Sequence, residues 1–238
     1  MKHMITLVRT DDNDAIFRVA GVDAGKVVLD EVSWYMPRVF PNDSQKLKLI
    51  KIIESKPTLD VGFRMRQCDT IGVTQTTSFT WRLSVRSAPE RPRWIFIALQ
   101  TDKSHDQAKN PAIFDHCNVT DMHVILNSDR YPECGYNANF TKQNVSRFYK
   151  DASDFMIKYS GLVNAECNIN PSEYTTLFPL FVFDVSKQSE RLKNGIVDVT
   201  VKMQFSTAVA ANTQAYAVVI CDRIIQFKGD GSKMSVVI

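Results

Sequence analysis

The chain of 238 residues is short of glycine, with nine in all. It contains neither a Gly-x-x-x-x-Gly-Lys loop nor a Gly-x-Gly-x-x-Gly turn, the backbone shapes that hold phosphate groups in common nucleotide-binding folds. The strained Gly-x-Ser-x-Gly turn of the serine hydrolases is missing as well. These absences argue against nucleotide chemistry and against serine hydrolysis.

The cysteines lack the spacing of a metal or redox site. They are odd in number, stand far apart and include no Cys-x-x-Cys pair: Cys68, Cys117, Cys134, Cys167 and Cys221. Such single cysteines are typical of reduced thiols that pack as small apolar side chains. Because no signal peptide is recognisable either, the pattern predicts a nuclear or cytosolic protein that is not secreted.

Long apolar runs and charge blocks are also missing. No stretch approaches the roughly 18 apolar residues that a membrane span needs, so we expect a soluble protein with no membrane span. The 29 basic and 26 acidic residues give a net charge of +3 and are scattered along the chain. Dispersed charge of this kind predicts no specific binding of nucleic acid.

What the sequence does contain is a succession of strand patterns. Segments that are alternately or continuously apolar lie at residues 5–9, 15–20, 26–38, 58–68, 76–86, 93–100, 117–127, 176–184, 196–205 and 215–227. Within them, residues 177–185 are continuously apolar and predict a buried strand, whereas residues 196–205 alternate and predict a strand on the wall of a sandwich. A loop at residues 186–194 separates the two. About ten strands favour a sandwich of two antiparallel sheets.

Two helices are predicted in the long connections between strands. The first starts near Ser44, where Asn42, Asp43 or Ser44 itself can cap it, and ends before Pro57. The second carries one apolar stripe and stops at Gly161: Val145, Phe148, Tyr149, Ala152, Phe155, Met156 and Tyr159. We expect each helix to pack on an outer sheet face or across an end of the sandwich.

The strongest metal candidate is Asp115-His116-Cys117, with Asp121 and His123 nearby. Carboxylate, imidazole and thiolate groups all bind zinc. On an extended strand, however, His116 and Cys117 point to opposite faces and cannot both reach one ion without a bend. We therefore predict a strand start with a buried Cys117 and a hydrogen-bonded His116, and no metal site.

Two further groups resemble binding sites only weakly. Asp11, Asn13 and Asp14 look like the opening of a calcium loop, but its glycine and distal glutamate are missing, so we predict a hairpin turn. The lysines of the first helix are interpreted as a solvated face rather than phosphate contacts: Lys46, Lys48, Lys51 and Lys56.

Paired carboxylates and one cationic segment are the remaining candidates for a functional site. Asp184 with Glu190, and Asp198 with Asp222, are interpreted as surface groups between strands rather than as acid–base pairs. The cationic segment is Arg91, Arg93 and Trp94, which combines positive charge with an aromatic ring on which bases could stack. Such a combination would suit the binding of single-stranded nucleic acid. A strand entry with Trp94 packed inward is the favoured interpretation. We predict no catalytic, cofactor-binding or metal-binding residue, no cofactor, and no enzymatic activity.

Taken in order, several segments resemble the C-terminal half of the double jelly-roll major capsid-like proteins of animal Polinton-type and adintovirus-type elements. They are residues 93–101 (RWIFIALQT), 114–117 (FDHC), 126–132 (LNSDRYP), 139–140, 184–190 (DVSKQSE), 195–199 (GIVDV), 212–216 (NTQAY) and 222–224. The resemblance spans roughly residues 5–228.

This resemblance implies a jelly-roll β-sandwich with a structural role in a virion. Family members resemble one another in carrying two jelly rolls per chain, with three chains forming a pseudo-hexagonal capsomer, whereas this sequence matches only the second roll. We therefore expect one jelly-roll domain over residues 5–238 and treat residues 1–4 as an added start. The expected partners are further copies of the chain or a preceding jelly-roll half, arranged in a trimeric capsomer. Minor capsid or penton proteins are possible further partners that the resemblance implies. The resemblance implies a virion location, with assembly in the host nucleus or cytoplasm.

Other classes of protein stay open from the sequence alone. A domesticated host protein that kept the capsid fold is one alternative, because a fold does not determine a function. A ligand-binding β-sandwich without enzymatic activity is another, with a groove drawn from Trp34, Tyr35, Trp81 or Trp94.

Overall fold

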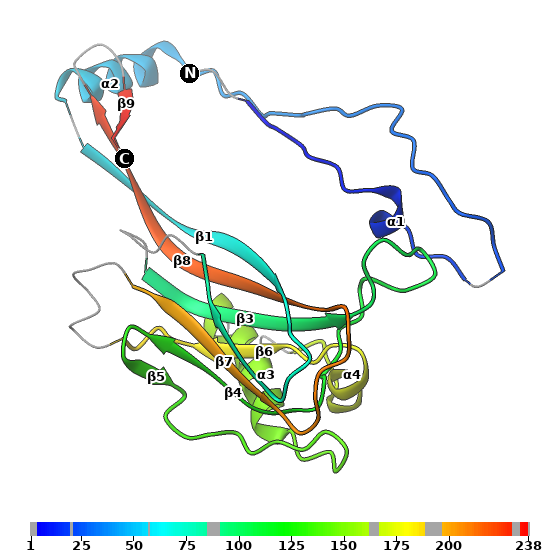
Figure 1. The fold of residues 1–238 in the computed structure, drawn as a ribbon. Helices are drawn as coiled ribbons and strands as arrows, with labels where there is room; N and C mark the ends of the chain where they lie inside the picture. The colour runs from blue at the N-terminus through cyan, green and yellow to red at the C-terminus, as the bar shows by residue number, and fades with distance from the viewer. Residues whose placement is uncertain are drawn as a thin grey trace.

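The computed structural model describes residues 4–19, 21–56, 58–84, 91–161, 167–188, 197–229 and 234–237, which form a β-sandwich with an extended N-terminal segment (Figure 1). One sheet contains β1 (Thr58–Gly72), β8 (Thr213–Gly229), β3 (Arg91–Thr101) and β6 (Phe181–Asp184) in that order, and β9 (Met234–Val237) pairs with β8. The other contains β2 (Ser78–Arg82), β7 (Val199–Phe205), β4 (Val119–Leu126) and β5 (Asp129–Tyr131).

The pairing of the strands is nested. β1 pairs with β8, β2 with β7, β3 with β6 and β4 with β5, and all four pairs are antiparallel. A chain that folds as one long hairpin and then wraps into two sheets of four strands has the topology of a jelly roll. The predicted sandwich of two antiparallel sheets is therefore confirmed.

The core lies between the two sheets. Alternate residues of β3 enter it, and Ile95, Ile97 and Leu99 have no exposed surface. Facing them, Val201 and Met203 of β7 are equally buried. Because β-strand side chains alternate between faces, the remaining β3 residues stand on the outer face of their sheet.

The two predicted helices are present. The first is α2 (Asp43–Glu54), and the side chain of its cap residue Asn42 accepts a hydrogen bond from the backbone N–H of Gln45 at 2.9 Å. The second is α3 (Ser146–Ser160), which ends at Gly161 in a left-handed conformation with φ of 67°. It packs against β6 on the outer face of the β1–β8–β3–β6 sheet. The expected placement of a helix on an outer sheet face is confirmed for α3.

Two short helices were not predicted from the sequence. α1 (Asp12–Ala15) stands where a hairpin turn was predicted, and Asp11 caps it by accepting from the backbone N–H of Asn13. α4 (Pro171–Thr176) precedes β6, so the predicted strand at residues 176–184 is confirmed only for Phe181–Asp184. Pro171 in the first turn and a capping box between Asn170 and Glu173 favour the helix there.

Three predicted strands near the N-terminus are wrong. Residues 5–9, 15–20 and 26–38 form no strand wherever the structure describes them, although each has a strand-like pattern. A strand needs a hydrogen-bonded neighbour, and these segments lie apart from both sheets (Figure 1). The short strands β5 and β9 were not predicted, and much of the predicted loop at residues 186–194 lies outside the described residues.

Candidate assembly surfaces

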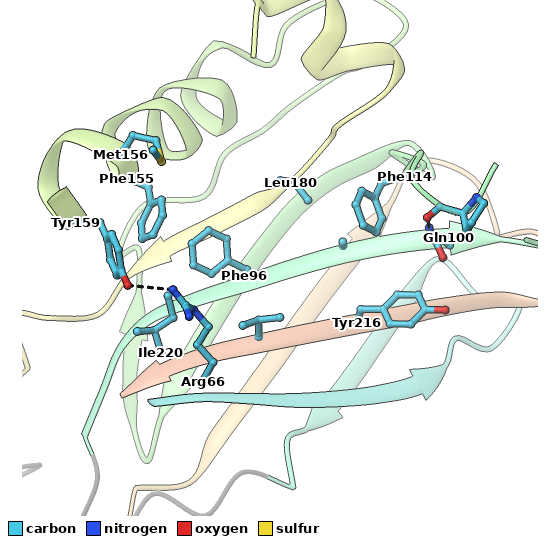
Figure 2. Close-up of a pocket in the computed structure, with 13 residues that line it drawn as sticks. Arg66, Phe96, Gln100, Phe114, Phe155, Met156, Tyr159, Leu180, Tyr216 and Ile220 are labelled. Atoms are coloured by element: carbon cyan, nitrogen blue, oxygen red, sulfur yellow. Dashed lines mark hydrogen bonds between the residues drawn. The ribbon is translucent and has the colours of Figure 1, made fainter. Parts of the chain in front are cut away.

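An apolar groove lies on the outer face of the β1–β8–β3–β6 sheet, beside α3 (Figure 2). Its floor comes from β3 and β8, which place Phe96, Val218 and Ile220 on this face. Phe155 of α3 forms one wall, and its ring meets Phe96 edge to face at 4.6 Å. The cavity measures about 690 Å³, a size typical of sites that bury a large part of a ligand or of a partner's side chains.

Polar groups stand at two ends of the groove. Arg66 donates to the hydroxyl oxygen of Tyr159 at 3.1 Å, and within the described part of the chain it forms no ion pair with a carboxylate. At the other end, the Gln100 side chain donates to the carbonyl oxygens of Pro111 and Ile113. The groove therefore offers a large apolar contact area with one cation at its edge, the composition of a docking surface.

The N-terminal segment, residues 4–56, is the second surface. None of its described residues is buried, and large apolar side chains stand in solvent along most of its length. Tyr35 is 89% exposed and Val39 is 86% exposed. Monomeric proteins rarely leave so much contiguous apolar surface in water. We call residues 4–56 the arm.

One loop holds the arm to the sandwich. The side chain of Gln107, which is itself buried, accepts from the backbone N–H of Gly25 at 2.8 Å and donates to the carbonyl oxygen of Gly25 at 2.9 Å. Its backbone carbonyl accepts from the N–H of Arg18 at 2.8 Å. His105 adds contacts with the carboxylate of Asp14. The loop at residues 101–111 thus forms the anchor of the arm.

A third surface lies where β1 and β8 run past the sandwich. Leu59, Val61 and Phe63 stand on one face of β1, opposite Phe227 and Ile225 of β8, and the three β1 side chains are exposed. Their face continues the core-facing side of the sheet, as the pairing of Met65 with buried Cys221 farther along shows. No strand of the second sheet covers it in Figure 1. We call residues 58–64, 222–229 and 234–237 the ribbon.

The predicted metal candidates form a turn. β4 begins only at Val119, and Cys117 and Asn118 have positive φ angles of 45° and 52°, which turn the chain before the strand. His116 is hydrogen-bonded as predicted, because its Nδ1 accepts from the N–H of Asn118 at 2.9 Å. Its ring stacks on Phe140 at 4.4 Å. No group of three or more potential metal ligands occurs among the described residues.

The neighbouring pair Asp121 and His123 lies on β4. Asp121 accepts from the backbone N–H of Tyr136 at 2.8 Å and from Arg130 at 3.1 Å. Nδ1 of His123 is buried 3.4 Å from the Asp121 carboxylate without a hydrogen bond. Burial, and then the charge of Arg130, lower the pKa of His123 despite the nearby carboxylate. Burial likewise lowers the pKa of His116 and raises that of the Cys117 thiol.

The carboxylate pairs are separated into different ion pairs. Asp198 binds Arg82 at 2.7 Å, whereas Asp222 binds Arg93 at 2.5 Å. Asp184 binds Lys158 at 3.2 Å, and Glu190 lies outside the described residues.

The aromatic candidates do not share one groove. Trp94 is buried as predicted, but it does not point inward between the sheets. It lies on the outer face of its sheet, beneath α3, so the predicted inward direction is wrong. Trp81 is in the main core, whereas Trp34 and Tyr35 are exposed on the arm. The lysines Lys46, Lys48 and Lys51 are exposed on α2, as predicted for a solvated face. The groove itself was missed, although apolar residues on both faces of β3 signal a covered outer face.

Comparison with known proteins gives one family match. A family model described as "Double jelly roll-like domain" matches residues 1–225. No curated protein matches the chain. Of the helices that the structure describes, none is long and apolar enough to cross a membrane.

Solved viral capsid structures are similar at low identity. The PBCV-1 protein VP54, fitted into a reconstruction of the virophage Sputnik, is 7% identical with a TM-score of 0.47, and the match covers 84% of this chain and 55% of that one. The mavirus major capsid protein is 10% identical with a TM-score of 0.37, covering 77% of this chain and 41% of that one. The chain therefore spans about half the length of the solved proteins it matches.

Proposed function

Since this chain belongs to the double jelly roll-like domain family, we propose that it is a structural capsid protein that joins other subunits through its apolar surfaces. The observation that carries the proposal is the arm, whose 53 positions from residue 4 to residue 56 include no buried described residue. Covering exposed apolar surface stabilises an assembly by about 25 cal/mol per Å². An arm of this composition is therefore stable only against a partner.

The proposed partner is another jelly roll. It is either a preceding jelly-roll half or a further copy of this chain, arranged as a trimeric capsomer. Jelly rolls assemble by repeating side-to-side contacts under symmetry, and the arm, groove and ribbon supply separate surfaces for such contacts. The single jelly-roll domain is proposed to span residues 5–238, with the arm passing to the neighbouring roll.

A virion location follows from the same proposal, with minor capsid or penton proteins as further neighbours. The segments that resemble proteins of Polinton-type and adintovirus-type elements support that origin. A domesticated host role would keep the same assembly and change only its setting. We propose no enzymatic activity, because the three surfaces offer contact area rather than paired acid and base groups.

Hydrogen exchange tests the role of the arm. In the assembled protein, backbone amides of residues 28–40 should exchange far more slowly than in a dilute, dissociated sample, because the partner covers them. Amides of β3 serve as the control and should be protected in both states. Fast exchange of residues 28–40 in both samples would contradict the proposal.

A ligand-binding sandwich is the second candidate, favoured only by the size of the groove. If the groove holds a small apolar ligand, a fluorescent fatty-acid probe should bind saturably, and Ala98→Trp should abolish binding by filling the floor. If the groove is an assembly surface, the same substitution should weaken subunit association instead.

A further inference from the structure

A second pocket lies at the end of the sandwich where β3 begins and β6 ends, since Trp94 pairs with Asp184 there. It encloses about 480 Å³ and, unlike the apolar groove, is lined mostly by charged side chains. Four of them are cations from four different parts of the chain: Arg64 of β1, Arg93 of β3, Lys158 of α3 and Lys187 after β6.

The cations outnumber the carboxylates at this pocket. Asp184 lines it and binds Lys158, while Asp222 binds Arg93 at 2.5 Å and reaches Arg64 at 4.0 Å. Four positive and two negative charges leave a net charge of +2. Lys187 is exposed and has no ion pair among the described residues. Gathering like charges from distant segments raises the free energy of the folded chain unless an anion compensates them.

The cations are held in place but keep free donors. Arg64 donates to the carbonyl oxygen of Tyr159 at 2.8 Å and lies 4.3 Å above the ring of that residue. The ammonium group of Lys158 lies 5.8 Å from the ring centre of Trp94. A guanidinium has five N–H donors and an ammonium three, so each cation retains hydrogen atoms for a ligand. Ser186 is already occupied, because its N–H and hydroxyl both donate to Asp184.

We propose that this pocket binds a phosphate-type oxyanion. A phosphate group carries close to two negative charges at neutral pH and several acceptor oxygens, which matches the net charge of +2 and the converging donors. The group comes either from free inorganic phosphate or from a nucleic-acid backbone, in which case recognition is independent of base sequence. This inference concerns a different site from the assembly surfaces and does not rest on the proposed function.

Isothermal titration with inorganic pyrophosphate tests the site. The protein should bind it saturably at low ionic strength, and Lys187→Glu should weaken binding about tenfold, because it removes the unpaired cation and adds a repulsive charge. Lys187 is exposed, so the variant should keep the melting temperature of the wild type. The matched control is Lys142→Glu, the same charge change at an exposed lysine in the turn before α3, and it should alter the affinity less than twofold.

A ten-nucleotide single strand of DNA, titrated in parallel, separates the two sources. Tighter binding of DNA than of pyrophosphate, lost in Lys187→Glu but not in Lys142→Glu, assigns the site to a nucleic-acid backbone. Tighter binding of pyrophosphate assigns it to free phosphate. The proposal is overturned if neither probe binds, or if the two variants weaken binding equally, since the effect is then one of overall charge.

Discussion

At the scale of single residues, Gln107 has the most specific role outside the core. Its buried amide satisfies both backbone groups of Gly25 and also contacts the carbonyl oxygen of Asp12 at 3.3 Å. A buried side chain that binds backbone atoms 82 residues away fixes where the arm leaves the sandwich. The Gln107 side chain is therefore a principal contact between the arm and the sandwich, together with the contacts of His105 with Asp14.

We expect Gln107→Ala to release the arm. Loss of these hydrogen bonds leaves polar backbone groups unpaired, at a local cost of about 1–3 kcal/mol. The amides of Arg18 and Gly25 should then exchange faster, while the melting temperature of the sandwich stays nearly unchanged. Gln143→Ala, at an exposed position, is the control. Unchanged exchange at Gly25 would show that the Gln107 side chain does not hold the arm.

We expect two histidines, His116 and His123, to make the protein less stable in mild acid. Because the pKa values of His116 and His123 are lowered by burial, the folded state favours their neutral forms. As the pH falls below the ordinary histidine pKa of about 6.5, the unfolded chain binds protons first, and the free energy of unfolding decreases. The melting temperature should fall from pH 7.5 to pH 5.5, and His123→Gln should reduce that fall.

At the scale of elements, the contact between α3 and the sheet is the best defined packing outside the main core. Phe155 meets Trp94 at 5.1 Å and Phe96 at 4.6 Å, both edge to face. The apolar stripe of α3 could be predicted from its spacing, and so could its end at Gly161. Which face of which sheet it covers could not, because that depends on β3, β6 and β8 meeting from distant parts of the chain.

Phe155→Ala should destabilise the fold by about 3 kcal/mol, since it removes a large ring from an aromatic cluster and leaves a cavity. Met156→Ala, on the open side of the groove, should cost well under 1 kcal/mol because its side chain is already exposed. Chemical denaturation of both variants measures the difference. Equal losses would mean that α3 is not anchored through Phe155.

The arm shows why an apolar pattern alone does not predict a strand. Residues 26–38 have the apolar content of a strand, yet no strand forms, because the pattern specifies a face and not the neighbour that must pair with it. Of the eight described sandwich strands, all but β5 were predicted at least in part, and each of these pairs with a partner within this chain. The groove and the hydrogen bonds between Gln107 and the arm were not predicted for the same reason, because they too depend on residues that are distant in the sequence.

The ribbon gives a prediction about association. Val61→Lys places a charge on its apolar face and should weaken subunit association at least about tenfold if a neighbour covers that face. Asp60→Asn, which makes the same charge change of +1 one position away on the opposite face, is the matched control and should have a small effect. Sedimentation velocity measures both, and equal effects would show that the face is not buried in the assembly.

At the scale of the whole molecule, the described residues form a jelly-roll sandwich with apolar surface left at its exterior. The nested pairing of its eight sandwich strands needs no partner, whereas the arm, the groove and the ribbon all present apolar surface at the exterior. The fold thus separates a buried core from apolar surfaces that a neighbour would cover in the proposed assembly. This division is what a shell subunit requires.

Electron microscopy of the purified natural protein, with mass measurement of the same sample, tests the central claim most directly. We predict particles with threefold symmetry and a pseudo-hexagonal outline, together with larger arrays at higher concentration. A uniform population of 27.0 kDa monomers at every concentration, with the arm still exposed, would contradict the structural role proposed for this chain.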